Sequence, residues 1–509
     1  MIPGKQGKAD INLPIAVPPP IGGLNSLASL MGAPVTDAVL LENFIPYPDR
    51  LEVRPGAQSF ATGSGKEIDA LYVYPGLTGT DLLLATTDSG VFNITAGGAW
   101  PAASIALTDG KTVGSILSTG ASTYLTICNG VDTVKQFDGT TWSAIATFGA
   151  VATTEYSYIE TYRQRYYLIR KNSMNLEYLA ANSISGAATQ YNLGAIFRRG
   201  GYLVALGTWT IDGGNGPDDH LAIATSQGEI AIFTGTDPAS ASTWSLKGVY
   251  YIGRPLGKKP LYKYGGDLLF LCENGLFPLS DALKSAAIDR TQGITKKIQP
   301  LFAQAAQDFF SNEGWDIIAL PDVPLLLVNI AGSPNRYSFA MHLQTGSWTR
   351  FSGWNARCFA RKGSTLYLGL NSSVAKMTGT SDFGVNITAT MLQAHSRLRI
   401  PANKKVEEIK PYFQSTGAFN YVLGIADDFI SPAQINSILI SSSSSVGIWG
   451  TSRWGAAYWT SDTNIITTSW RTVPNKYSMW KAIYLQIVST STSAQYFGSD
   501  LLVMRGSGF

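Results

Sequence analysis

The stretch "LAIATSQGEIAIFTGTDPASASTW", residues 221–244, holds two apolar runs with a Gly between them and a Trp at its end. Both runs are rich in β-branched and aromatic residues, so they predict two neighbouring strands joined by a tight turn. Phe233 lies on the second run, ahead of Trp244. This stretch decides the fold because the chain repeats its pattern.

Three further stretches share the pattern of two runs, a turn, an aromatic residue and a terminal Trp. They are "DLLLATTDSGVFNITAGGAW" (residues 81–100), "YLTICNGVDTVKQFDGTTW" (124–142) and "LLLVNIAGSPNRYSFAMHLQTGSW" (325–348). Weaker copies occupy the gaps, at residues 166–180, 266–280 and 364–377. A period of about 40 to 50 residues is the length of a four-stranded propeller blade.

The repeat predicts a β-propeller-like domain of six or seven blades over residues 61–380. A single blade has two apolar faces, and stacking blades around a ring covers both. The repeated aromatic residues are therefore interpreted as packing between blades, with a platform for sugars or bases as the alternative. They are Trp100, Trp142, Trp244 and Trp348, with Phe92, Phe137, Phe233 and Phe339.

The composition favours an all-β fold. The 509 residues are 45% hydrophobic and 14% charged, with 52 Gly and many aromatic residues, which suits short strands and tight turns. With 38 Lys plus Arg against 35 Asp plus Glu, the net charge of +3 gives no global case for binding nucleic acid or an anionic membrane. Cys128, Cys272 and Cys358 lie far apart, so we predict reduced, buried thiols.

Two segments interrupt or follow the repeat. Near residues 297–311, Ile298, Leu301, Phe302, Ala305 and Phe309 have helical spacing after Pro300, which predicts a short helix packed on the ring edge or against a neighbouring subunit. From residue 381 the period is lost, and seven short alternating strands predict a β-sandwich over residues 381–509.

The first 60 residues are apolar but rich in Pro and Gly. The segment "PPPIGGLN", residues 18–25, fits neither a helix nor a sheet interior. Residues 1–60 are therefore interpreted as an extended assembly arm, with at most a short helix at residues 26–31, lying on the protein's own surface or on a neighbour. No apolar run has the length of a signal peptide or a membrane span, which predicts synthesis in a cytoplasm and no stable membrane insertion.

The sequence shows no constellation for catalysis: it has no phosphate-binding loop, zinc motif or nucleophile elbow. His220, His342 and His395 are isolated from one another. We therefore predict no enzyme, no catalytic, cofactor-binding or metal-binding residues and no cofactor. One alternative is a cation held by Asp212, Asp218 and Asp219, against a solvated Gly/Asp loop.

The last third also holds three tryptophans, Trp449, Trp454 and Trp459, spaced every five residues behind a serine run. This spacing matches no strand face, so we interpret them as a loop that packs onto the sandwich. The alternative is that they stack on a ligand such as a glycan.

The chain resembles the tail nozzle proteins of short-tailed bacteriophages. The resemblance runs from "PPPIGGLN…MGAPVTDAVLLENFIPYPDRLEVRPG" through the propeller-like middle to "WG…RWG…YW" and "GSDLLVMRGSGF" at the end. It implies a structural virion protein, assembled in the bacterial host cytoplasm, that forms a homo-hexameric ring at the distal end of the tail. This ring would continue the DNA channel and gate the retention and release of the genome.

The resemblance also implies partners. The arm would dock on the tail adaptor ring or on the adjacent subunit, tail fibres or spikes are further candidates, and double-stranded DNA would pass through the lumen without specific binding. A near-neutral chain suits such a conduit, because a basic wall would hold DNA through counterion release. The alternative from another class is a carbohydrate-binding or glycan-cleaving β-propeller that works as a monomer.

Overall fold

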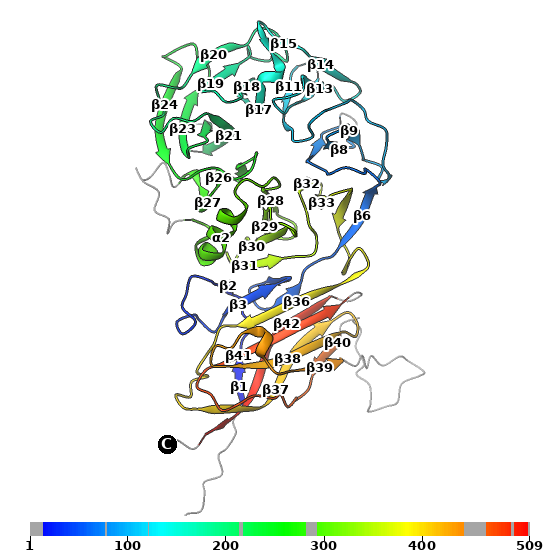
Figure 1. Ribbon diagram of the computed structural model, residues 1–509, viewed down its shortest axis with the longest axis vertical. Helices are drawn as coiled ribbons and strands as arrows, with labels where there is room; N and C mark the ends of the chain where they lie inside the picture. Colours follow the sequence, from blue (N-terminus) through cyan, green and yellow to red (C-terminus); the bar gives the residue numbers. More distant parts are fainter. Residues whose placement is uncertain are drawn as a thin grey trace, which may run out of the picture. The chain divides into compact units, whose positions relative to one another are not determined.

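The computed structural model describes residues 14–76, 79–120, 122–212, 217–280, 293–441, 465–489 and 493–506. The chain forms two compact units, each treated by itself below (Figure 1). Unit 1 comprises Met1–Gln58, Phe339–Gly353 and Thr378–Phe509, and unit 2 comprises Ser59–Ser338 and Trp354–Met377. No helix among the described residues has the length and apolar character needed to cross a membrane.

The described part of unit 2 contains seven groups of antiparallel strands, of which the last two belong to one 16-stranded sheet, and a separate two-stranded sheet of β15 (Thr147–Phe148) and β16 (Val151–Ala152). Their strands are β7 (Ala70–Tyr74), β8 (Leu82–Thr87) and β9 (Gly90–Asn93); β11 (Val113–Ser118), β12 (Thr123–Cys128), β13 (Val134–Phe137) and β14 (Trp142–Ile145); β17 (Tyr156–Tyr162), β18 (Arg165–Arg170), β19 (Asn175–Tyr178) and β20 (Thr189–Asn192); β21 (Leu203–Asp212), β22 (Pro217–Thr225), β23 (Glu229–Gly235) and β24 (Trp244–Tyr251); β25 (Leu261–Tyr264), β26 (Asp267–Cys272) and β27 (Gly275–Pro278); β28 (Asp316–Leu320), β29 (Leu325–Ile330) and the start of β30 (Tyr337–His342); and β32 (Cys358–Lys362), β33 (Thr365–Gly369) and β34 (Ser373–Met377).

The first strands of these sheets form a closed ring. Each contacts the first strand of the next sheet, in the order β7, β11, β17, β21, β25, β28 and β32, and β32 contacts β7 again. The early strand β6 (Ala57–Thr62) lies beside β34 in the last sheet, so the start of the unit completes the blade that its end begins. Unit 2 is a seven-bladed β-propeller, and closure leaves only short sheet edges.

The repeats seen in the sequence are the middle strands of the blades. The four strong copies hold β8 and β9, β12 and β13, β22 and β23, and β29 and β30, while the three weaker copies hold β18 and β19, β26 and β27, and β33 and β34. The seven copies thus account for the seven blades. The fourth strong copy ends outside the propeller, because β30 crosses into unit 1 and its neighbour β31 (Trp348–Phe351) belongs to unit 1.

In two of the four strong copies the aromatic residues pack within and between blades, as predicted, whereas Phe339 and Trp348 of the fourth copy lie in unit 1, outside the propeller. Phe137 stacks on Trp142 with ring centroids 5.0 Å apart, and it meets Tyr74 of the preceding blade at 5.0 Å. Trp244 stacks on Phe233 at 5.2 Å and on Tyr167 of the preceding blade at 6.1 Å. In these two blades, the Phe–Trp pair therefore packs within the blade and also against the preceding blade.

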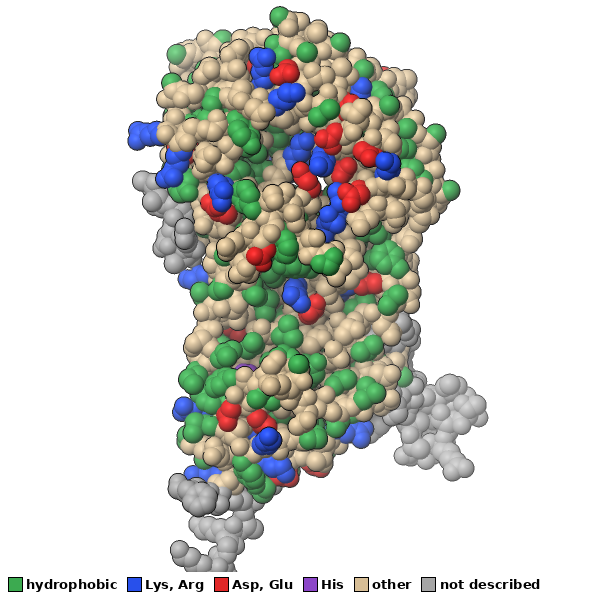
Figure 2. All heavy atoms as spheres, viewed as in Figure 1, with side chains coloured by type: hydrophobic (Ala, Val, Ile, Leu, Met, Phe, Trp, Pro, Cys, Tyr) green, Lys and Arg blue, Asp and Glu red, His purple; other side chains and the backbone are tan. Residues whose placement is uncertain are grey.

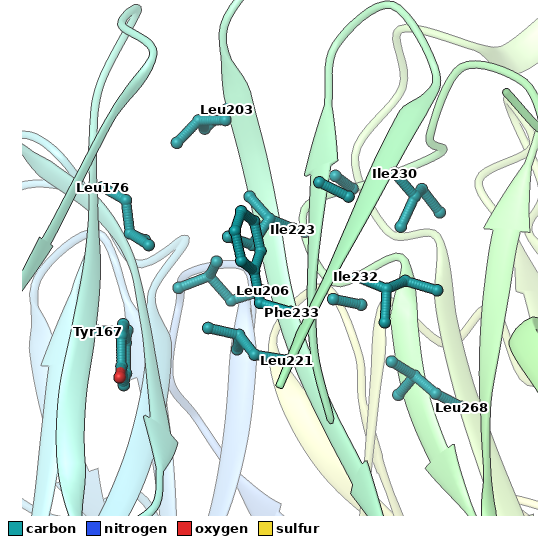
Figure 3. Packing of buried hydrophobic residues seen from close by; sticks show 14 of the residues in the cluster. Tyr167, Leu176, Leu203, Leu206, Leu221, Ile223, Ile230, Ile232, Phe233 and Leu268 are labelled. Atoms are coloured by element: carbon teal, nitrogen blue, oxygen red, sulfur yellow. The ribbon is translucent and has the colours of Figure 1, made fainter. Parts of the chain in front are cut away.

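Aliphatic side chains fill the space behind these rings. Figure 3 shows Tyr167 and Leu176 of one blade facing Leu206 and Leu221 of the next, with Leu268 of the third blade on the other side. All of these side chains are buried. The alternation of inward residues along each strand thus gives every blade two apolar faces.

The predicted short helix is present as α2 (Gln299–Phe309), with Pro300 in its first turn. Phe302, Ala305 and Ala306 are buried, and the Phe302 ring lies 6.1 Å from Trp315 in the same unit. This apolar face therefore packs on the propeller itself, which agrees with one of the two expected roles. Leu301 points outward and is 42% exposed.

Unit 1 consists of two sheets. The first contains β1 (Pro14–Val17), β4 (Phe44–Pro46), β5 (Leu51–Val53), β37 (Lys404–Ser415), β40 (Ile465–Thr468) and β42 (Ala494–Arg505). The second contains β2 (Gly23–Leu24), β3 (Asp37–Glu42), β31, β36 (Val385–Gln393), β38 (Asn420–Asp427), β39 (Ser437–Ser441) and β41 (Lys481–Ser489), with the short β35 (Ser381–Asp382) leading into β36. The Phe413 ring of the first sheet meets Tyr421 of the second at 4.8 Å, so the sheets share an aromatic core.

The N-terminal segment differs from the separate arm that the sequence suggests. In its described part, β1 pairs antiparallel with β42, and β3 pairs with β36, so residues 14–58 complete both sheets of unit 1. Pro and Gly residues lie between the short strands and do not prevent them. Of the two expected positions, this part of the segment takes the one on its own chain. Residues 1–58 and 339–353 therefore join residues 378–509 in one unit, unlike the expected division at residues 60 and 380.

Residues 26–31, for which the sequence allows at most a short helix, form bends and turns. The Asn25 side-chain oxygen accepts hydrogen bonds from the N–H groups of Leu27 at 3.1 Å and Ala28 at 3.0 Å. The Ser29 hydroxyl accepts another from the Gly32 N–H at 3.1 Å. Such local bonds to side chains compete with the helical pattern.

Candidate functional site

A buried ion pair holds the N-terminal segment against the rest of unit 1. The guanidinium of Arg54, which is 1% exposed, donates to both carboxylate oxygens of Asp382, at 3.0 and 2.5 Å. It also donates to the side-chain oxygen of Asn43 at 2.8 Å and to the carbonyl of Ser352 at 2.5 Å. These contacts compensate the positive charge of Arg54 in the protein interior, where an unpaired charge would cost folding free energy.

Asn43 supplies the turn that this arrangement needs. Its φ of 58° lies in the left-handed region, which Asn tolerates better than most residues. Its side-chain nitrogen donates to the Thr388 carbonyl at 2.8 Å, and its side-chain oxygen also accepts from the Ser352 N–H at 2.9 Å. The "ENF" and "RPG" parts of the opening signature are therefore two halves of one buried cluster.

The residues that directly precede the opening signature pair with the closing signature, and Pro19 of the opening signature lies close to Gly498, where a Cβ would come within 3.3 Å of the Pro19 Cδ atom. In β1 and β42, Ile15 pairs with Leu501 and Ala16 with Asp500. The side chain of Gln393, on β36, donates to the carbonyls of Pro18 at 2.8 Å and Val35 at 2.6 Å. Gly23 has a φ of 78°, and a Cβ there would lie 2.6 Å from the Trp348 backbone oxygen. The glycine of "PPPIGGLN" is needed for this close approach.

A lysine cluster lies at the start of β37 in the same unit. Lys404 is 0% exposed, and its ammonium donates to the carbonyls of Ile400 and Ala402, each at 3.0 Å, and of Met479. The ammonium of the nearby Lys481 pairs with Asp427. Burial, together with the like charge of Lys481, lowers the pKa of Lys404 to about 8.

Replacing Lys404 with methionine is expected to lower the free energy of unfolding by about 1–3 kcal/mol at pH 7, because three buried carbonyls lose their donor. Between pH 8 and about 10.4, the unfolded chain keeps a proton that folded Lys404 has released, so the stability of the wild type rises with pH. The difference between wild type and variant should therefore widen from pH 7 to pH 9.5 in urea unfolding. Lys405→Met, at an exposed ion pair, is the control. A difference in the free energy of unfolding that stays constant between pH 7 and pH 9.5 would contradict this prediction.

Charged side chains also gather where the first strands of the propeller begin. Figure 2 shows Lys, Arg, Asp and Glu side chains interspersed on one face of the propeller. A cavity of about 50 Å³ there is lined by Asp69, Lys111, Thr112, Lys258, Lys259, Glu313, Gly314, Trp315, Asp316, Arg357 and Cys358. Pockets for drug-sized ligands measure about 300–1,000 Å³, so this cavity holds at most a few waters.

The charges at this cavity bind one another across the blades. Arg357 contacts Asp69 at 3.0 Å, and Lys111 contacts Glu313 at 3.7 Å. The Asp316 carboxylate accepts the N–H of Phe359 at 2.8 Å, which ties two neighbouring blades. Burial raises the pKa of Asp316, although the charge of Lys259 opposes it, and burial lowers the pKa of Lys258. The arrangement is suited to joining blades.

Each of the three histidines lies against an aromatic ring. His220 lies 5.1 Å from the Trp209 ring, His342 lies 5.0 Å from Tyr47, and His395 lies 4.8 Å from Phe429. All three are buried, and burial lowers the pKa of His342 and His395. Among the described residues, no group of side chains that could hold a metal ion includes them.

The other candidate residues are the three aspartates considered for a cation site and the three tryptophans considered for ligand stacking. Asp219 forms an ion pair with Arg163 at 3.1 Å; Asp212 and Asp218 lie in the hairpin of β21 and β22, where Ile211 pairs with Asp218. No acidic cluster that could hold a metal occurs in the described part of the chain. Trp449, Trp454 and Trp459 lie outside the described residues.

The prediction of reduced, buried thiols is confirmed for Cys128, Cys272 and Cys358, which are buried and form no disulfide. Burial raises the pKa of Cys128 to about 12, which keeps its thiol protonated and unreactive. These cysteines therefore serve as small core residues.

The sequence reading missed the cluster of Asn43, Arg54 and Asp382. Arg54 and Asp382 are 328 residues apart, and no local pattern links them. The one signal was Arg54 in "LEVRPG", next to the apolar Val53, where a buried charge needs a partner.

No protein-family model matches the chain, and no curated protein matches it. Among solved structures, the Cps50 (Swd1) β-propeller domain of Myceliophteria thermophila is 12% identical, covers 64% of this chain and 98% of that one, and has a TM-score of 0.38. YCF48 from Cyanidioschyzon merolae is 12% identical, covers 66% and 98%, and has a TM-score of 0.38. Raptor of Chaetomium thermophilum is 11% identical, covers 64% and 28%, and has a TM-score of 0.41. At these TM-scores the neighbours carry no argument about function, and the all-β propeller assignment rests on the closed ring of strands.

Proposed function

We propose that this chain is a structural subunit of a short phage tail. Six copies form the nozzle ring at the distal end of the tail, continue the DNA channel, and retain the genome until ejection. The protein is not an enzyme in this account. It is assembled in the bacterial host cytoplasm and becomes part of the virion.

One observation carries the proposal: the terminal signatures of the nozzle resemblance form one folded element. β1, which leads directly into the opening signature, pairs with β42 of the closing signature. Pro19 of the opening signature lies close to Gly498 of the closing one, and Arg54 binds Asp382. Residues of the two signatures therefore depend on one another in the fold of this chain. Chance matches at two distant ends of the sequence would not need to be in contact. This supports the resemblance as a likeness of a whole architecture.

The proposed partners follow from the same likeness. The N-terminal segment would meet the tail adaptor ring through the folded surface of unit 1, because its described part already lies on its own chain. DNA would cross the lumen without specific binding, in line with the formal charge of +3. Tail fibres or spikes would contact the outside of the ring.

Native mass spectrometry of the purified full chain tests the assembly. The proposal predicts a ring of six copies, in equilibrium with smaller assemblies at low concentration. The carbohydrate-binding alternative predicts a monomer that a glycan array captures. A stable monomer that binds glycan would therefore contradict the nozzle proposal.

A further inference from the structure

Basic side chains gather at one end of unit 1, which is formed by residues 396–405, 475–481 and 505–506. These segments carry seven basic residues and no acidic one: Arg397, Arg399, Lys404, Lys405, Lys476, Lys481 and Arg505. In the described part of the chain, their ion pairs and hydrogen bonds reach three carboxylates, those of Glu407, Asp427 and Asp428. The surplus of four positive charges exceeds the net charge of +3 of the whole chain. We call this surface the basic end.

The three segments of the basic end are joined by backbone contacts. Lys404 lies opposite Arg505 in the pairing of β37 with β42, and it forms an antiparallel bridge with Ser478. The Gly506 N–H donates to the Asn403 carbonyl at 2.8 Å. Parts of the chain that are up to a hundred residues apart therefore share one surface, and their charges act together on anything that meets it.

Part of this positive charge has no counterpart within the unit. The ammonium of Lys481 pairs with Asp427, and that of Lys405 pairs with Glu407 at 3.2 Å. Three other basic side chains are exposed and form no ion pair with any described residue: Arg399, Lys476 and Arg505. Like charges that are held close together repel one another and oppose folding, and a bound anion relieves this repulsion. The basic end is therefore suited to an anionic partner.

Apolar and aromatic side chains lie among these charges. Tyr477 is 48% exposed and Met479 is 37% exposed, directly beside Lys476 in the sequence. The guanidinium of Arg397 lies 4.8 Å from the centre of the Trp480 ring. Aromatic rings with a polar edge, apolar side chains and flanking basic residues are the combination found where proteins lie on the headgroup layer of a membrane.

Two strained turns support the same surface. Leu398 and Arg399 have φ values of 50° and 58°, and Asp428 and Phe429 have φ values of 40° and 66°, so two consecutive pairs without glycine lie in the left-handed region. This conformation is costly for bulky side chains such as those of Leu398 and Phe429. The Asp428 carboxylate holds its turn by accepting the Trp480 N–H at 2.9 Å. Backbone strain of this kind concentrates where proteins bind ligands.

We propose that the basic end binds the surface of a membrane that contains anionic phospholipid. The lipid phosphates pair with Arg399, Lys476 and Arg505, while Tyr477 and Met479 enter the layer between the headgroups and the acyl chains. A nucleic acid would also supply phosphates, but Met479 offers no ring on which a base could stack. The inference is independent of the nozzle proposal, because a single chain carries the whole surface.

Co-sedimentation of the full chain with lipid vesicles tests the surface. Wild type should bind vesicles of phosphatidylcholine mixed with phosphatidylglycerol at about 0.1 M salt, and it should be released at about 1 M salt, where charges are screened. Arg399→Asn/Lys476→Gln should lower the partition coefficient about 30-fold, which is about fivefold for each charge removed. This variant should melt at or above the wild-type temperature, because Asn tolerates the left-handed conformation of residue 399.

Two further variants separate the basic end from charge in general. Lys247→Gln/Lys296→Gln removes two exposed lysines of the propeller and should bind the vesicles like wild type. Met479→Ser keeps every charge and should lower the partition coefficient about fivefold, through the loss of apolar contact with the lipid.

Three results would overturn the proposal. They are a wild-type chain that does not sediment with the anionic vesicles, equal losses in the Lys247→Gln/Lys296→Gln and Arg399→Asn/Lys476→Gln variants, and binding that double-stranded DNA at the same phosphate concentration abolishes. The last result would assign the basic end to nucleic acid. None of them bears on the number of copies in a ring, so the nozzle proposal stands or falls separately.

Discussion

Replacing Arg54 with leucine is expected to lower the free energy of unfolding of unit 1 by about 3–5 kcal/mol, the cost of leaving a buried charge without its partner. Asp382 would lose two hydrogen bonds from the guanidinium, and the carbonyl of Ser352 would lose a donor. The loss should appear in unit 1 first, because every one of these groups lies there. Hydrogen exchange followed by mass spectrometry separates the two units and is the appropriate measurement.

Two matched variants sharpen this prediction. Arg50→Leu removes a partly exposed arginine that pairs with Asp49 at 2.9 Å, and it should cost less than about 1 kcal/mol. Arg54→Leu/Asp382→Leu removes both charges, so it should recover part of the loss, as hydrophobic replacement of buried pairs often does. Equal effects of Arg50→Leu and Arg54→Leu would contradict the structural role of the buried pair.

Replacing Trp244 with alanine should lower the free energy of unfolding of the propeller by about 3–5 kcal/mol. The indole stacks on Phe233 of its own blade and on Tyr167 of the preceding blade, so its loss opens a cavity at a joint between blades. Urea unfolding, with hydrogen exchange to assign the affected blades, measures the effect. Protection should fall in the strands on both sides of the joint.

Trp142 provides the internal comparison for this prediction. It occupies the equivalent place in its blade and stacks on Phe137 at 5.0 Å, but it is only half-buried. Trp142→Ala should therefore cost clearly less than Trp244→Ala. A larger loss for Trp142, or no loss for Trp244, would show that the aromatic pairs do not hold the blades together.

The propeller could be predicted from the sequence because each blade has a local sequence pattern that recurs in the other blades. The paired runs and the terminal Trp depend on neighbours within one hairpin, such as Phe137 opposite Trp142. The helix near Pro300 and the alternating strands after residue 381 are likewise local signals. The blade number of seven follows once the three weaker copies are counted as full blades.

The make-up of unit 1 could not be predicted in the same way. The pairing of β1 with β42 and of Arg54 with Asp382 joins residues from opposite ends of the chain, and nothing in the local pattern records such partners. The assembly arm was inferred from Pro and Gly content, which limits regular structure but does not exclude short strands between the breaks. Residues 26–31, where the sequence allows at most a short helix, form none because the side chains of Asn25 and Ser29 accept hydrogen bonds from the backbone N–H groups.

Cryo-electron microscopy of native phage particles tests the central claim most directly. The account predicts sixfold density for this chain around a central channel at the distal end of the tail. Density for this chain away from the tail axis, or particles that lack it, would contradict the claim that it builds the nozzle.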